Sequence, residues 1–271
     1  MMAEYYFLFG LAAVWMVFAV VQDLRSREVS NWLNFSLLTV ALAYRGFYAL
    51  IEAKPEFFLF GLLGFLMFFV LGFAFYYGRV FAGGDVKLLW ALGAVLPIES
   101  YWGLFLVGFG FVFLVLLIGA VYSLIWGMFI VNRNWRIFSK EFNERFRKGW
   151  SLFIVSGVLG GLLGFVYGGL YGVFSGTLVF LIPGIYFYLR GLDKCMTVRL
   201  KAKDLQEGDW LEKRVKLKKG WIEKSVHGLS LKEIGKLKRE GKKVWIKQGI
   251  PFTPAILISF LIGAYVYLKM F

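Results

Sequence analysis

Two aspartates stand where a charged side chain is costly. Asp23 ends the first long apolar run of the chain, and Asp85 stands just before the fourth. An ionisable group within or beside a membrane span calls for a reason. Two carboxyl groups a few ångströms apart do not both ionise easily, so one holds a proton while the other is a base. Such a pair can activate a water for attack on a peptide carbonyl and then protonate the leaving amine, without metal, serine or histidine.

The residues around Asp85 fit this chemistry. Gly83 and Gly84 leave no side chains where a substrate backbone must come close. Residues 86–96 form an apolar run that would be roughly 17 Å long as a helix, short of a hydrocarbon core of about 30 Å. Asp85 is therefore expected near a membrane-buried peptide. Lys87, one turn into this run, either tunes the pair or snorkels to the interface.

The carboxylates have other interpretations that spacing alone leaves open. Asp23 could be a helix-end carboxylate paired with Arg25 or Arg27. Asp85 could be favoured by the positive end of a helix dipole or paired with Lys87. A proton-coupled transporter could also use the same two acids. The position of both acids at helix ends argues against a transporter, because transporters tend to place binding groups at the midplane.

The elements that must position these acids are membrane spans. Hydrophobic residues make up 59% of the 271 residues, well above a soluble domain, and the net charge is +14. A span needs about 20 mostly apolar residues. The chain is predicted to be a polytopic α-helical membrane protein of about eight spans, with Gly168 and Gly169 as a turn between two of them. The apolar runs are 5–21, 32–51, 57–77, 86–96, 101–131, two passes within 150–189, and 250–268.

Positive charge predicts which side faces the cytoplasm. Segments 23–31, 78–85, 132–149 and 190–250 hold 27 of the 31 Lys and Arg residues, and the eight-span topology places all four on one side. Cytoplasmic loops carry such an excess, so both aspartates are expected at the cytoplasmic face of a multi-pass cell-membrane protein. Segment 132–149 is predicted to be a basic loop. Arg45 lies within the second span and is expected to snorkel.

Three regions are predicted: a membrane core over 1–190, a basic cytoplasmic α+β domain over 191–250, and a last span over 251–271. Strands are expected at 196–200, 210–217 and 244–246. A short helix is expected at 230–239, with Ser230 and Glu233 forming a capping box. The basic surface favours membrane lipid as a partner, and no nucleic acid.

Cysteine and histidine are nearly absent. Cys195 is the only cysteine, which excludes an internal disulfide framework and a Cys-rich zinc site. His227 is the only histidine and is interpreted as a solvated loop residue. No metal and no cofactor are predicted.

The motifs resemble those of a known family. Asp85, with its preceding glycines and Lys87, resembles the GxGD motif of intramembrane aspartyl proteases followed by the x-K-L of type IV prepilin and preflagellin peptidases. Asp23, Arg25 and Asn31 resemble that family's first catalytic stretch, D-x-R-x-x-x-[IV]-P-N. Two positions depart from the pattern: Ala82 stands at the first glycine of GxGD, and Ser30 at the proline before the asparagine. The region from Gly249 to Ala255 is similar to the C-terminal region of archaeal members.

This resemblance implies a membrane aspartyl endopeptidase without a cofactor and an archaeal source. Members remove short basic leader peptides from prepilin or preflagellin precursors, just before the hydrophobic helix. Carried over by motif, Asp23 and Asp85 are the catalytic pair. Gly83, Gly84 and Lys87 support the second site, and Arg25 and Asn31 shape the first. The Cys-tetrad domain that many bacterial members link to N-methylation cannot form here, so peptidase activity without methyltransferase activity is expected.

Overall fold

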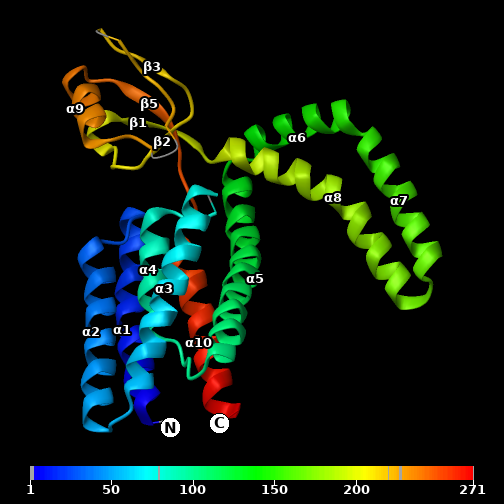
Figure 1. Ribbon diagram of the computed structural model, residues 1–271. Helices are drawn as coiled ribbons and strands as arrows, with labels where there is room; N and C mark the ends of the chain where they lie inside the picture. The colour runs from blue at the N-terminus through cyan, green and yellow to red at the C-terminus, as the bar shows by residue number, and fades with distance from the viewer. Residues whose placement is uncertain (1–2, 79, 219, 226–227, 271) are drawn as a thin grey trace. The chain divides into compact units, whose positions relative to one another are not determined.

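Helices dominate the structure. The computed structural model describes residues 3–78, 80–218, 220–225 and 228–270. They divide into two units, one of Met1–Leu124 with Ile250–Phe271 and the other of Ile125–Gly249. Within the first unit, five helices and the first part of a sixth lie side by side (Figure 1). These are α1 (Ala3–Ser26), α2 (Asn31–Ile51), α3 (Pro55–Tyr77), α4 (Gly83–Val95), α5 (Tyr101–Arg133) and α10 (Thr253–Met270).

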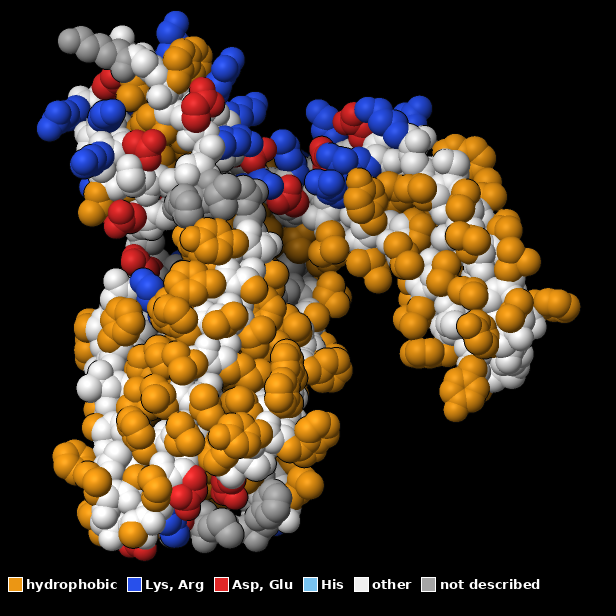
Figure 2. All heavy atoms as spheres, viewed as in Figure 1, with side chains coloured by type: hydrophobic (Ala, Val, Ile, Leu, Met, Phe, Trp, Pro, Cys, Tyr) orange, Lys and Arg blue, Asp and Glu red, His pale blue; other side chains and the backbone are white. Residues whose placement is uncertain are grey.

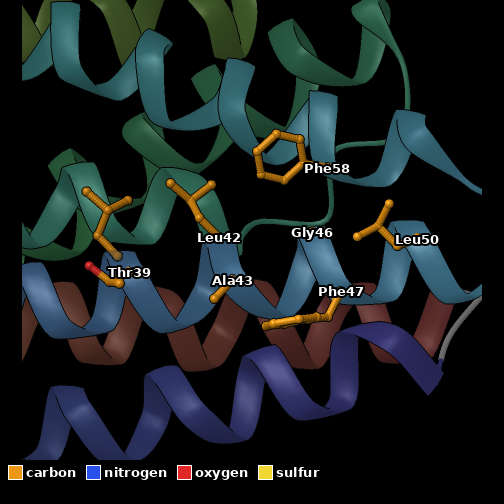
Figure 3. Close-up of a pocket in the computed structure, with 8 residues that line it drawn as sticks. Thr39, Leu42, Ala43, Gly46, Phe47, Leu50 and Phe58 are labelled. Atoms are coloured by element: carbon orange, nitrogen blue, oxygen red, sulfur yellow. The ribbon is translucent and has the colours of Figure 1, made fainter.

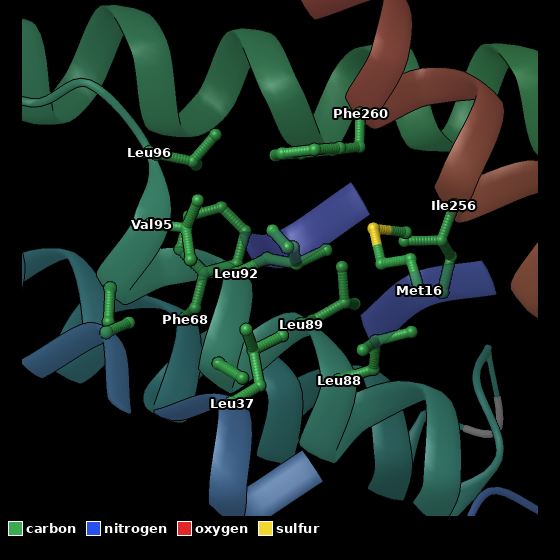
Figure 4. Packing of buried hydrophobic residues seen from close by; sticks show 14 of the residues in the cluster. Met16, Leu37, Phe68, Leu88, Leu89, Leu92, Val95, Leu96, Ile256 and Phe260 are labelled. Atoms are coloured by element: carbon green, nitrogen blue, oxygen red, sulfur yellow. The ribbon is translucent and has the colours of Figure 1, made fainter. Parts of the chain in front are cut away.

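The short helix α4 forms the centre of the first unit. Nine of its 13 residues are buried. Figure 4 shows Leu88, Leu89 and Leu92 of this helix among apolar side chains of α1, α2, α3 and α10. The helix lies so close to α3 that a Cβ atom on Gly93 would be 2.6 Å from the carbonyl oxygen of Gly64. Because most of α4 is buried, the part of the helix after Lys87 is apolar, and its central position allows it to be shorter than a bilayer-spanning helix.

The outward faces of the first unit are apolar as well. Large hydrophobic side chains such as Phe18, Phe47 and Val70 are more than half exposed, and Figure 2 shows hydrophobic side chains covering the visible face of these helices. A soluble protein does not expose such a continuous apolar surface. The predicted class, a multi-pass helical membrane protein with a small sheet-containing domain before the last helix, is confirmed.

The number of spans differs from the eight predicted. Six described helices are long and apolar enough to cross a membrane, or up to seven if one bent pair counts as a span. Each predicted apolar run is a helix, but α4 has only 13 residues and α7 (Ser151–Tyr167) has 17. The bent pair joins α7 to α6 (Trp135–Gly149) at an angle of 65°.

Helix α6 corrects the prediction of a basic loop over 132–149. Its aromatic residues recur at helical spacing, and Phe138 packs on Phe142 and Tyr188 with ring centroids 5.6 and 5.8 Å apart. Salt bridges between residues four apart, such as Glu141 with Arg145, add support on the polar face. The spacing of Phe138, Phe142 and Phe146, four residues apart, is the sequence signal that predicts this amphipathic helix.

The turn predicted between two passes is present. Helix α7 ends at Tyr167 and α8 (Gly169–Cys195) begins two residues later, with φ of 60° at Gly168 and 51° at Gly169. Glycine adopts such angles without steric cost. The two helices then pack closely, because a Cβ on Gly160 would lie 2.6 Å from the carbonyl oxygen of Gly176.

The second unit also contains the predicted α+β domain. Strands β1 (Thr197–Lys201), β5 (Lys243–Lys247) and β2 (Trp210–Leu211) form an antiparallel sheet in the order β1-β5-β2. Its buried residues cluster with Ile234 and Leu237 of α9 (Leu231–Arg239). The capping box of Ser230 and Glu233 is confirmed.

The strand prediction over 210–217 is only partly right. Residues 210–217 split into β2 and β3 (Val215–Lys216), and β3 pairs with β4 (Trp221–Ile222) in a separate hairpin. A 3₁₀ turn (Ala202–Asp204) follows β1. Lys and Arg side chains gather over the sheet and over α6 (Figure 2). His227, interpreted above as a loop residue, lies outside the described residues.

Candidate active site

The two aspartates lie on different helices and are both buried. Asp23 is near the end of α1 and is 6% exposed, and Asp85 is the third residue of α4 and is 7% exposed. Both belong to the first unit. The end of α1 and the beginning of α4 therefore bring two carboxyl groups, 62 positions apart in the chain, into the interior of one bundle.

A third residue joins them. The backbone N–H of Thr253, the first residue of α10, donates to Asp23 Oδ2 at 3.0 Å. The Thr253 hydroxyl donates to Asp85 Oδ1 at 3.4 Å. Thr253 itself is fully buried. Because one residue touches both carboxyl groups, the start of α10 is part of the site.

Thr253 has no predicted role in the site from its local sequence. The signal available was the stretch Gly249–Ala255, which resembles archaeal peptidases and opens the last span. A threonine in a predicted helix end carries no charge and has no unusual cost, so nothing in its local sequence marks it. Its role depends on contacts with residues 230 and 168 positions away.

The predicted glycines differ in their surroundings. A Cβ atom on Gly84 would be 3.3 Å from the backbone nitrogen of Val29, in the turn between α1 and α2. The carbonyl oxygen of Gly84 also accepts a hydrogen bond from Asn34 Nδ2 at 3.3 Å. A Cβ on Gly83 would make only an ordinary contact with Tyr76 at 3.7 Å. The approach of α4 to the α1–α2 turn is thus tight at position 84, whereas position 83 has room for a methyl group.

Two further predicted residues contact each other. Lys87 Nζ donates to Asn31 Oδ1 at 2.6 Å, which links the first turns of α4 and α2. Lys87 is half-buried, and its ammonium group lies against Asn31 instead of extending freely to the surface. The structure thus brings together Asp23, Asp85, Gly84, Asn31 and Lys87, whereas the side chain of Arg25 is exposed.

The departure at Ser30 has a local explanation. The side-chain oxygen Oε1 of Gln22 accepts hydrogen bonds from the backbone N–H of Ser30 at 3.0 Å and from its hydroxyl at 2.9 Å. Ser30 has φ of −63°, the value that proline would impose. Two hydrogen bonds to Gln22 therefore hold the turn that a proline ring would otherwise make rigid.

Arg45 corrects the expectation of a snorkelling side chain. It is fully buried and donates three hydrogen bonds of 2.7 Å, to the carbonyl oxygens of Ala94, Leu96 and Phe57. Two of these carbonyls belong to the C-terminal end of α4, where helix carbonyls lack partners within the helix. Gly61 makes room, because a Cβ there would collide with the Arg45 stem. Arg45 thus fixes the end of α4 opposite Asp85.

A shallow apolar groove on α2 and α3 has no chemical groups for catalysis. It begins one turn after Asn34 on α2, and Figure 3 shows apolar side chains around it. No titratable residue is among those that line it, which are Leu38, Thr39, Leu42, Ala43, Gly46, Phe47, Leu50 and Phe58. Its chemistry suits a hydrocarbon chain. Among the described residues, no three His, Cys, Asp or Glu side chains converge in a way that could hold a metal ion.

The fold and the site together define a polytopic membrane protein with a buried pair of carboxyl groups at helix ends. Residues 10–135 match the type IV leader peptidase family. The chain is also similar to the preflagellin peptidase of Methanocaldococcus jannaschii, with 33% identity over 89 residues. That similarity covers 33% of this chain and 38% of the relative, so the chain spans well under half of that relative's length.

These matches confirm the resemblance to type IV prepilin and preflagellin peptidases that the motifs indicated. The matched segment, residues 10–135, contains both aspartates and all the predicted supporting residues. Neither match points to a transporter. No solved structure matches the chain.

Proposed function

We propose that this protein is a membrane aspartyl endopeptidase that removes the short basic leader of prepilin-like or preflagellin precursors. The observation that carries this proposal is the meeting of Asp23 and Asp85, both buried, on the two donor groups of Thr253. The family match over residues 10–135 supports the same reaction class.

The pair supplies both a base and an acid. The ionised carboxylate takes a proton from a water as the water oxygen, now hydroxide, attacks the scissile carbonyl carbon. The protonated carboxyl group hydrogen-bonds to the carbonyl oxygen as negative charge develops there. When the carbon–nitrogen bond breaks, a carboxyl group gives a proton to the leaving amine. Burial of both aspartates keeps bulk water away from this exchange.

The depth of the site suits a particular cut. Asp23 lies near the end of one apolar helix and Asp85 near the beginning of another. A substrate helix lying in the bilayer would present its own first residues at that level. Peptide-bond cleavage is therefore expected just before the hydrophobic helix of the precursor, where the leader ends.

Charge supports a cytoplasmic orientation for the site. The residues that follow Asp23 include Arg25, in the last turn of α1, and Arg27, and the segment 190–250 carries 18 Lys and Arg residues. By the positive-inside rule these segments face the cytoplasm. The exposed apolar helix faces contact membrane lipid, and residues 191–250 form a basic cytoplasmic domain between the core of 1–190 and the span of 251–271.

The test is cleavage of full-length precursors by the purified protein in lipid nanodiscs. A panel of prepilin and preflagellin precursors, each with its leader and hydrophobic helix, is incubated with the protein, and products are identified by mass spectrometry. A single cut just before the hydrophobic helix is expected. The matched control substrate keeps the leader but replaces the helix with a soluble sequence, and we expect it to stay intact. Failure of the folded protein to cut any precursor, or cuts within the hydrophobic helix, would contradict the proposal.

A further inference from the structure

Thr253 is fully buried and directs two hydrogen-bond donors, its backbone N–H and its hydroxyl, at the two aspartates. It is the first residue of α10, because the carbonyl of Phe252 accepts the N–H groups of Ala255 and Ile256. The first N–H groups of a helix have no partner within the helix. That of Thr253 is directed to Asp23, and the side chain of the same residue reaches Asp85.

The start of α10 is held in place by apolar packing. The ring of Phe252 lies against Phe81, just before α4, with ring centroids 5.0 Å apart. It also fills the space beside Gly119 of α5, where any Cβ atom would collide with it. Phe252 thus ties the beginning of α10 to the segment that leads into Asp85. Because these contacts are apolar and fix the start of α10, they also fix the positions of the Thr253 N–H and hydroxyl groups.

The two Thr253 groups differ in hydrogen-bonding capacity, because the N–H can only donate whereas the hydroxyl can donate or accept. A backbone N–H can only donate, so the Asp23 oxygen facing it must accept, which an ionised carboxylate does best. The positive end of the α10 dipole favours negative charge at the same place. A hydroxyl can donate or accept, so Thr253 can serve Asp85 in either protonation state. The arrangement makes Asp23 the member suited to stay ionised and Asp85 the member suited to carry the proton.

We propose that Thr253 is a positioning residue of the peptidase, which holds the two carboxyl groups at a set separation and assigns the base to Asp23 and the acid to Asp85. This inference rests on the proposed function. It makes the last helix, far outside the segment that matches the family, a necessary part of the site. Nothing in Thr253 touches substrate in this role, because both of its donors are used by the aspartates.

Replacement of the hydroxyl separates positioning from folding. Thr253→Val keeps the shape and the N–H but loses the hydroxyl, whereas Thr253→Ser keeps both donors. We expect kcat for a precursor to fall about 10- to 100-fold in the valine variant. KM should stay within about twofold, since substrate contacts are unchanged. The serine variant should recover kcat to within about threefold of wild type. The pair Thr253→Ser and Thr253→Ala repeats the comparison if valine impairs folding.

The amide is tested by Thr253→Pro, which removes both donors at a helix position that tolerates proline. Its kcat should fall below that of the valine variant. Thr177→Val is the matched control, because Thr177 is exposed and its hydroxyl donates to Val173 O in its own helix. Wild-type kcat in the valine variant, or equal loss in the serine and alanine variants, would overturn the role of Thr253 and leave the proposed function standing. A wild-type protein that cleaves no precursor would overturn both.

Discussion

The ammonium group of Lys87 donates a 2.6 Å hydrogen bond to the side-chain oxygen of Asn31 and thereby joins the first turns of α4 and α2. Lys87 follows Asp85 by two residues, and Asn31 follows the turn that comes after Asp23. The contact therefore holds together the two segments that carry the aspartates. The motifs indicated both residues as supporting ones, but not that they contact each other.

The Lys87–Asn31 hydrogen bond predicts that substitutions of these two residues have non-additive effects on kcat/KM. Lys87→Met and Asn31→Leu should each lower kcat/KM about tenfold, because either change frees the start of α4 to shift relative to α2. The double variant should lose little more than either single variant, since the same interaction is already broken. Precursor cleavage by all four proteins gives the coupling energy. Effects that simply multiply would show that the two residues act independently.

Substitution of Arg45, which lies at the end of α4 opposite Asp85, is expected to lower the stability of the protein. Arg45→Lys leaves at least two of three buried carbonyl groups without a donor, because an ammonium group cannot reproduce the planar guanidinium fork. We expect the free energy of unfolding to fall by about 3 kcal/mol. Thermal unfolding in one detergent measures the difference. Arg25→Lys, at an exposed position, should unfold like the wild type, and an equally stable Arg45→Lys protein would contradict the assigned role.

Gly83 and Gly84, which precede Asp85, allow a matched comparison of two glycine-to-alanine substitutions. Gly84→Ala places a methyl group 3.3 Å from the Val29 nitrogen, so the turn or the helix must move by a few tenths of an ångström. We expect kcat to fall about tenfold. Gly83→Ala meets only Tyr76 at an ordinary distance and should stay near wild type. Greater loss from Gly83→Ala would indicate that substrate, rather than Val29, requires the missing side chain.

Much of the membrane fold could be predicted because apolar periodicity is a local property. The helices containing Asp23 and Asp85 begin or end within a few residues of the predicted spans, and the turn at Gly168 follows from glycine itself. Helix α6 was not predicted because its many charged residues are typical of a loop as well as of the polar face of an amphipathic helix. The six or seven spans that the length and composition of the described helices support are fewer than the eight expected, since an apolar run such as α4 has the same sequence pattern whether it crosses lipid or is buried in protein.

The candidate site could be predicted only in part. The aspartates were found because a carboxylate beside a span is costly and therefore conspicuous. Thr253 and Arg45 depend on distant partners, and local sequence does not reveal them. A threonine at a helix end is ordinary, and an arginine within a span reads as snorkelling until its three carbonyl partners are known.

The central claim, that Asp23 and Asp85 act together in peptide-bond hydrolysis, is tested most directly by single Asp→Asn substitutions. Asparagine keeps the size of each side chain but can neither take nor supply the proton. Precursor cleavage should fall about 1,000-fold or more in both Asp23→Asn and Asp85→Asn. Asp204→Asn, at an exposed position in the sheet-containing domain, should cleave at the wild-type rate. Cleavage that survives in either Asp23→Asn or Asp85→Asn would contradict the paired-carboxylate mechanism.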